Sequence, residues 1–198
     1  MMISKIQQLP STLVNQIAAG EVIERPASVV KELLENALDA KATHIIVTLS
    51  FGGMNAISVA DNGVGISPEE LPLSVAPHAT SKIQHLDDLS AITTMGFRGE
   101  ALASIASISR FTIQSKPAHA ECAMQLTWQD ESVQLTPCAR DVGTTVTVND
   151  LFYNTPVRKR FLGSEKTEFL AIDRLMRCFA LSTPELKLDF YHQGQCIF

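Results

Sequence analysis

Cysteine is sparse in this 198-residue chain, and its four copies are scattered as Cys122, Cys138, Cys178 and Cys196. None of them stands in the C-x-x-C spacing that zinc sites and thiol–disulfide oxidoreductases use. A disulfide framework is equally unsupported, because domains that depend on disulfides carry cysteine far more densely. The cysteine content therefore favours a reducing cytosol.

Long apolar runs are also missing. No segment approaches the ~18 consecutive apolar residues of a membrane-spanning helix. The first ten residues, M-M-I-S-K-I-Q-Q-L-P, lack the apolar stretch of a secretory signal peptide. We therefore expect no membrane partner. Hydrophobic residues still make up 45% of the chain, which is ample for a core.

Positive charge is in deficit, with 16 Lys and Arg residues against 21 Asp and Glu residues and a net charge of −5. Proteins that bind nucleic acid by electrostatic attraction are usually basic where they bind. Wholesale DNA binding is therefore not the default expectation, and an anionic ligand would need locally concentrated positive groups.

Three common enzyme signatures are absent. The sequence contains neither the G-x-x-x-x-G-K-[ST] phosphate loop nor the dinucleotide fingerprint G-x-G-x-x-G. It also has no G-x-S-x-G nucleophile elbow, so a serine hydrolase is not supported.

Helical and strand-like patterns are mixed without regular β-α-β alternation. Apolar residues recur at helical spacing in 11–23, 26–40, 100–107 and 165–181. They alternate in 45–49, 57–59, 111–115, 123–128, 132–135, 144–150 and 186–191. We therefore predict an α+β fold, a two-layer sandwich of a mostly antiparallel sheet with helices on one face.

Turn and loop signals connect these elements. Hairpin turns are predicted at 51–54 and 192–195, and a capped helix start at 67–70, S-P-E-E. The irregular stretch 72–99 is typical of a lid. The last residues look like the first half of a hairpin, which suggests a fragment of a longer protein.

The segment 26–40, P-A-S-V-V-K-E-L-L-E-N-A-L-D-A, is the clearest helix, and Pro26 suits its first position. Glu32 and Asn36 are four residues apart, so they lie one above the other on its polar side. A solvated face would explain both. However, asparagine is a poor mid-helix residue, because its amide competes for backbone hydrogen bonds. An asparagine beside a carboxylate can hold a hard cation and a water.

Asp61-Asn62-Gly63-Val64-Gly65 follows a predicted strand. An ordinary turn would explain it, but a helix start rather than a partner strand comes next. The glycines allow a ligand to approach the backbone closely. The Asp61 carboxylate can accept a hydrogen bond from an exocyclic amine such as that of adenine.

Two further segments suit phosphate. The run G-F-R-G-E-A-L at 96–102 places glycines and Arg98 before a helix, whose free N–H groups can face an anion. The run H-A-T-S-K at 78–82 offers two hydroxyls and an ammonium. Each segment alone is also explained by a solvated loop. The same holds for the basic run R-K-R at 158–160, which suits either DNA phosphate or solvent.

Four segments resemble, in order and spacing, the four ATP-site motifs of the GHKL family. They are E-L-L-E-N-A-L-D-A at 32–40, D-N-G-V-G at 61–65, G-F-R-G-E-A-L at 96–102 and G-T-T at 143–145. That family comprises gyrase B, Hsp90-type chaperones, histidine kinases and MutL proteins. The segments 15–34, 78–83, 96–105 and 151–162 look like the MutL branch in particular. The resemblance covers nearly the whole chain.

The resemblance implies a Bergerat-type ATP-binding fold and a Mg²⁺-dependent ATPase. Glu32 would be the general base that aligns the attacking water, and Asn36 would hold Mg²⁺. Asp61 would read the adenine amino group with support from Thr144. The other implied ATP-binding residues lie in the glycine turn or in a lid at about 72–99: Gly63, Gly65, Thr80, Ser81, Lys82, Gly96, Phe97, Arg98, Gly99, Glu100, Ala101 and Leu102.

The resemblance further implies part of a DNA mismatch repair protein. ATP would close the lid, order an N-terminal arm at about 1–15 and promote N-terminal homodimerisation. This cycle would couple a MutS-type mismatch recogniser to a downstream nuclease or helicase in the bacterial cytosol. DNA would be contacted mostly through a transducer domain and a C-terminal dimerisation domain outside this chain, so the chain alone should hydrolyse ATP weakly or not at all.

Two positions depart from the MutL pattern. Pro77 stands where a basic residue is expected, which would weaken lid or phosphate contacts. Lys41 stands where glycine is expected, so the helix would lose its usual left-handed cap. A histidine kinase or chaperone-type ATPase is an alternative, although Glu32 argues against a kinase, which does not activate water. The third alternative is a DNA-binding or interaction module with a vestigial ATP site. The presence of Glu32, Asn36 and Asp61 argues against it.

Overall fold

The computed structural model describes residues 19–20, 22–77, 79, 100–129 and 132–198. Its eight strands are β1 (His44–Ser50), β2 (Ala56–Asp61), β3 (Arg110–Lys116), β4 (Ala123–Gln129), β5 (Ser132–Cys138), β6 (Gly143–Asn149), β7 (Lys187–His192) and β8 (Gln195–Cys196). They form one sheet in the order β5-β4-β3-β6-β2-β1-β7-β8. Of the described pairings, only that of β1 with β7 is parallel.

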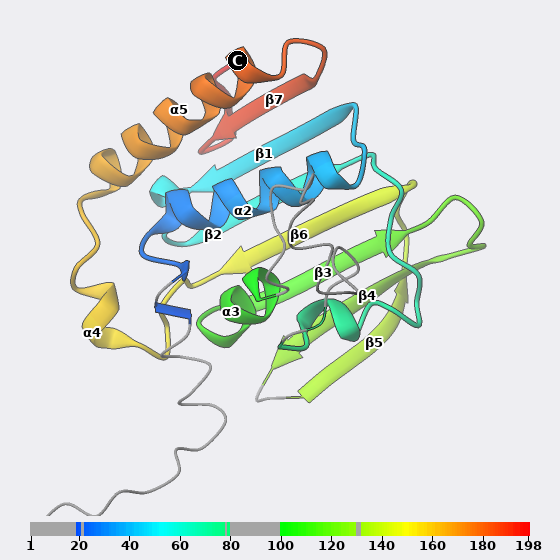
Figure 1. Ribbon diagram of the computed structural model, residues 1–198. Coiled ribbons are helices and arrows are strands. Elements are labelled where there is room, and N and C mark those ends of the chain that lie inside the picture. Colours follow the sequence, from blue (N-terminus) through cyan, green and yellow to red (C-terminus); the bar gives the residue numbers. More distant parts are fainter. Residues whose placement is uncertain (1–18, 21, 78, 80–99, 130–131) are drawn as a thin grey trace, which may run out of the picture.

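Helices cover one face of this sheet (Figure 1). The α-helices are α2 (Pro26–Asp39), α3 (Ala101–Ser107), α4 (Pro156–Lys159) and α5 (Glu165–Ser182), and the 3₁₀ turns are η1 (Phe51–Gly53) and η2 (Leu73–Val75). The predicted α+β sandwich with a mostly antiparallel sheet is therefore confirmed. Within the described ranges, no helix combines the length and apolarity needed to cross a membrane.

The helix α2 has the predicted amphipathic character. Its buried face consists of Pro26, Val29, Val30, Leu33, Leu34 and Ala37. This face packs on β2 and against α5, over inward-facing aliphatic residues of the sheet such as Val47 and Val59. The polar residues between them are consequently turned away from the core, which places Glu32 and Asn36 on the accessible side.

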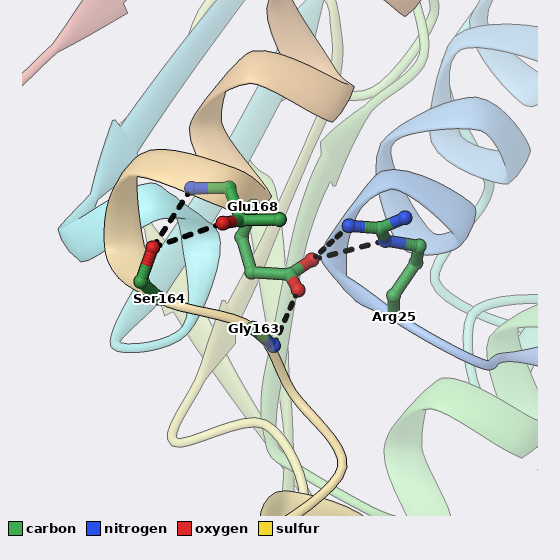
Figure 2. A network of polar contacts seen from close by, with 5 residues as sticks. Arg25, Gly163, Ser164 and Glu168 are labelled. Atoms are coloured by element: carbon green, nitrogen blue, oxygen red, sulfur yellow. Dashed lines mark hydrogen bonds and ion pairs between the residues drawn. The ribbon is translucent and has the colours of Figure 1, made fainter.

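An ion pair between half-exposed Arg25 and the buried carboxylate of Glu168 lies where α2 begins. Glu168 on α5 has a side chain only 3% exposed, and its Oε2 accepts a hydrogen bond from Nε of Arg25 and forms an ion pair with Nη2, both at 3.0 Å. Its Oε1 accepts from the Gly163 N–H at 2.8 Å, while Ser164 caps the first turn of α5 (Figure 2). A buried carboxylate is tolerated only when it is paired and hydrogen-bonded in this way. The pair joins the starting ends of α2 and α5.

The end of α2 corrects one expectation. Lys41 adopts the left-handed conformation with a φ of 61°, so the cap that glycine usually provides is kept. The Ala42 N–H bonds the Ala37 carbonyl at 3.1 Å, and the Lys41 N–H bonds the Leu38 carbonyl at 2.9 Å. These two bonds are the Schellman pattern. The helix α2 therefore ends with the same left-handed cap that a glycine would provide. Lys41 adopts this backbone conformation although it is unfavourable for a residue with a side chain.

We predict that Lys41→Gly stabilises the protein by about 1 kcal/mol, because left-handed backbone costs a residue with a Cβ roughly 1–2 kcal/mol. The larger unfolded-state freedom of glycine offsets part of that gain. Urea unfolding of the wild type and the variant measures the difference. Lys41→Ala is the matched control and should bring no such gain, since alanine keeps the Cβ. Equal stability of all three proteins would show that the cap is unstrained.

Other local predictions had mixed outcomes. The hairpins at 51–54 and 192–195 are confirmed by the β1–β2 and β7–β8 pairings. The Ser67 hydroxyl oxygen accepts the Glu70 N–H at 3.3 Å as a cap should, but turns and η2 follow instead of an α-helix. Pro72 explains this, because it has no N–H to continue a helix. The helix α4 was not predicted, and most of the predicted helix at 11–23 lies outside the described residues.

Candidate functional site

Asp61 is the last residue of β2 and lies opposite Thr144, at the start of β6. Its Oδ1 accepts the Gly63 N–H at 2.8 Å and the Thr144 N–H at 3.2 Å. Burial raises the pKa of the Asp61 carboxyl, while the two N–H groups and Arg140 act in the opposite direction. The structure thus holds a partly buried carboxylate in a fixed orientation at the end of the strand.

A buried hydroxyl pair lies behind this carboxylate. The Oγ1 of Thr144 and the Oγ of Ser115 are 2.9 Å apart, and both residues are buried. Ser115 also donates to the Gly143 carbonyl and accepts the Ile66 N–H at 2.8 Å. Sequence reasoning missed Ser115, although a signal existed: it follows Phe111 and Ile113 on the inward face of the strand pattern.

The turn after Asp61 packs against the end of α2. A Cβ on Gly63 would lie 2.6 Å from the Ala40 carbonyl oxygen, which also accepts the Val64 N–H at 3.0 Å. Gly65 has a φ of 74°, and a Cβ there would lie 2.4 Å from the Lys116 carbonyl oxygen. Packing within the protein therefore explains both glycines. Their role in letting a nucleotide lie close stays a prediction.

Asn62, by contrast, serves the fold. Its Oδ1 accepts the N–H groups of Thr43 and His44, both at 2.9 Å, and its amide donates to the Thr43 hydroxyl. These bonds fix the Asp61 turn to the beginning of β1. The turn is consequently anchored to β1, to β6 and to α2, the helix that carries the other candidate residues.

Glu32 and Asn36 lie on the polar side of α2, and both are half-buried. The Glu32 side chain is 22% exposed, and its Oε1 is 3.9 Å from Nζ of Lys31. Lys31 makes its shorter contact, 2.8 Å, with Glu35 instead. The contact with Glu35 is the main reason that the pKa of Lys31 is raised. The helix thus presents a carboxylate and an amide one turn apart, as predicted.

The remaining predicted residues divide into two groups. Glu100 precedes α3, and Ala101 and Leu102 form its first turn, beside η2 and β3. The predictions for Thr80, Ser81, Lys82, Gly96, Phe97, Arg98 and Gly99 fall outside the described residues.

Arg140 is the main functional candidate that sequence reasoning missed. Its Nη2 donates to the Asp61 main-chain carbonyl at 2.7 Å, from the loop between β5 and β6. The only available signal was a charged residue just before the G-T-T motif. Arg140 also lines a shallow cavity of about 500 Å³, together with Lys116, Glu121, Cys122, Ala123, Cys138, Ala139 and Asp141.

Metal ligation by protein side chains alone has no support here. Across the ranges that the structure describes, no three His, Cys, Asp or Glu side chains gather as a metal site.

Known proteins resemble this chain in sequence and in fold. Residues 23–146 match the family described as histidine kinase-, DNA gyrase B- and HSP90-like ATPase. DNA mismatch repair protein MutL of Histophilus somni is 53% identical over 97% of this chain and 32% of its own length. MutL of Vibrio parahaemolyticus is 54% identical over 97% of this chain and 29% of its own length. The chain thus spans about a third of the length of these curated relatives.

Solved structures agree with the sequence relatives. The Aquifex aeolicus MutL ATPase domain complexed with ADP superposes with a TM-score of 0.74 at 34% identity, covering 89% of this chain and 63% of that one. The N-terminal domain of a DNA repair protein superposes with a TM-score of 0.76 at 30% identity, covering 92% and 54%. The chain therefore belongs to the histidine kinase-, DNA gyrase B- and HSP90-like ATPase family and is homologous to the ATPase domain of MutL.

Proposed function

We propose that this chain binds and hydrolyses ATP as the N-terminal domain of a MutL-type DNA mismatch repair protein. The observation that carries the proposal is the fixed carboxylate of Asp61. Both of its described hydrogen bonds go to Oδ1, so Oδ2 is the oxygen available to a ligand. A partly buried carboxylate that is already oriented can select an amino group, because an analogue without that group leaves the carboxylate unpaired.

The adenine amino group is the donor that this carboxylate would read. Thr144 supports it through its N–H and through the buried hydroxyl pair with Ser115. Gly63 and Gly65 would give the nucleotide access to the turn. The homologous Aquifex aeolicus domain was solved with ADP, which supports binding of an adenine nucleotide by this chain.

Glu32 and Asn36 would act at the phosphates. Glu32 is the proposed general base, which orients the attacking water and accepts its proton. Asn36 is chemically suited to a magnesium site because it carries an amide oxygen on the polar side of α2, one turn from a carboxylate. Mg²⁺, when bound, would neutralise phosphate charge. The lid at about 72–99 and residues 96–102 would supply Lys82, Arg98 and backbone N–H groups.

The cellular role is proposed from the MutL relatives. ATP-driven lid closure and homodimerisation would couple a MutS-type mismatch recogniser to a nuclease or helicase, in the bacterial cytosol where the DNA lies. DNA itself would be bound mostly by sequence outside this chain, in agreement with the net charge of −5.

The proposal is tested by calorimetry of a non-hydrolysable ATP analogue with and without Mg²⁺, with the oligomeric state recorded in parallel. We expect saturable binding that Mg²⁺ strengthens and that favours the dimer in the full-length protein. Asn36→Ala should lose the Mg²⁺-dependent part of the affinity and keep the rest. Absence of binding, or a Mg²⁺ effect that survives in Asn36→Ala, would contradict the assignment.

A further inference from the structure

We propose that Arg140 is a positioning residue for adenine selection, which holds the end of β2 so that the Asp61 carboxylate faces the amino group of the base. The inference rests on the proposed role of Asp61 in reading adenine. It assigns a role to a residue outside the four motifs, 79 positions away from Asp61 in the sequence.

Arg140 is anchored by all three nitrogens of its guanidinium. Nη2 donates to the Asp61 carbonyl at 2.7 Å, Nη1 to the Asp141 carbonyl at 2.8 Å, and Nε to the Thr145 hydroxyl at 3.0 Å. One planar group therefore joins the last residue of β2, the loop before β6 and the third residue of β6. Lysine cannot reproduce this arrangement, because its ammonium is a single point with no planar fork.

The main-chain carbonyl of Asp61 is closely packed against β6. A Cβ on Gly143 would lie 2.1 Å from its oxygen, so β6 approaches the peptide more closely than any side chain would allow. A charged donor forms a stronger bond with such a carbonyl than a neutral donor does. Since the Asp61 side chain is bonded to Gly63 and Thr144 at the same time, fixing the carbonyl fixes the direction of the carboxylate.

The charge of Arg140 supports the same role. Burial raises the pKa of the Asp61 carboxyl, and the nearby guanidinium opposes that shift, which favours the ionised acceptor. Asp141 and the Cys138 thiol also interact electrostatically with the guanidinium. Arg140 is itself half-buried, and burial lowers its pKa. Such a group is retained in this position only while its hydrogen bonds are satisfied.

The test compares ADP with IDP, whose base carries an oxygen in place of the amino group. We expect the wild type to prefer ADP. Arg140→Met and Arg140→Lys should weaken ADP binding by about 10–100-fold, the usual effect of losing a hydrogen bond to a charged group, and leave IDP binding nearly unchanged. The ADP-to-IDP preference therefore collapses. A role limited to general stability would weaken both nucleotides equally, and that result would overturn the inference.

Arg174→Met and Arg174→Lys, at an exposed position on α5, are matched controls and should keep the wild-type preference. Circular dichroism verifies the fold of each variant, and Arg140→Lys supplies the test if Arg140→Met does not fold. If the wild type bound ADP and IDP equally well and Asp61→Asn did not change nucleotide binding, the proposed function itself would be contradicted. A preference that depends on Asp61 but not on Arg140 would remove only this inference.

Discussion

Replacing Glu32 with alanine should slow ATP hydrolysis by about 10²–10⁴-fold, the usual contribution of a general base. The affinity for ATP should stay close to that of the wild type. The reason is that the Glu32 carboxylate is proposed to act on the attacking water, while Asp61 at the end of β2 is proposed to read the base. Loss of Glu32 should therefore lower the turnover rate and leave the affinity for ATP nearly unchanged.

Steady-state hydrolysis and calorimetry on the same preparations measure the two effects. The full-length protein is the right material, because the solved ATPase domains that match this chain are themselves longer than it. Glu35→Ala is the matched control: Glu35 lies on the same helix with a side chain 15% exposed and pairs with Lys31 at 2.8 Å. Its turnover should stay at the wild-type level. Turnover retained in Glu32→Ala would remove Glu32 from the role of base.

The sequence was sufficient where local periodicity decides the structure. The apolar stripe of 26–40 and Pro26 predicted α2 almost to the residue, since apolar residues at 3.6-residue spacing behind a first-turn proline are typical of a helix. The alternating runs likewise predicted the strands, and Asp61 was correctly placed at the end of one. The face of α2 that carries Glu32 and Asn36 followed directly from that periodicity.

Contacts between distant segments were not accessible in this way. Arg140 meets Asp61 across 79 positions, and Arg25 meets Glu168 across 143. The sequence around each arginine does not indicate its partner, because the two segments come together only when the whole sheet has formed. Lys41 illustrates the opposite error: local preference predicted the loss of the left-handed cap, but the two Schellman hydrogen bonds keep Lys41 in that conformation.

Replacing Asp61 with alanine should abolish adenine-nucleotide binding, with a loss on the order of 10⁴-fold, which is typical when a site selected by a buried hydrogen bond loses that bond. Two effects combine. The adenine amino group loses its acceptor, and the N–H groups of Gly63 and Thr144, which now bond Oδ1, lose theirs. Calorimetric titration with ADP measures the change. Asp150→Ala, directly after the neighbouring strand β6, removes an exposed carboxylate that pairs with Arg110 and should leave the affinity unchanged.

The same carboxylate predicts how binding depends on pH. Burial raises the pKa of Asp61 above its ordinary value of 3.8, so the carboxyl takes up its proton at a higher pH than a free aspartate. The ionised acceptor is present above that raised pKa and disappears as the pH falls through it. ADP affinity should therefore decline on acidification, before a free aspartate would titrate. The phosphates titrate in both nucleotides, and the adenine ring of ADP also takes up a proton in acid, so the ratio of ADP to IDP affinity is compared between the wild type and Asp61→Asn. As the pH is lowered, this ratio should begin to fall at a higher pH in the wild type than in Asp61→Asn, which has no carboxyl to protonate at this position. Identical pH profiles of the ratio in the two proteins would show that the ionisation of Asp61 plays no part in reading the base.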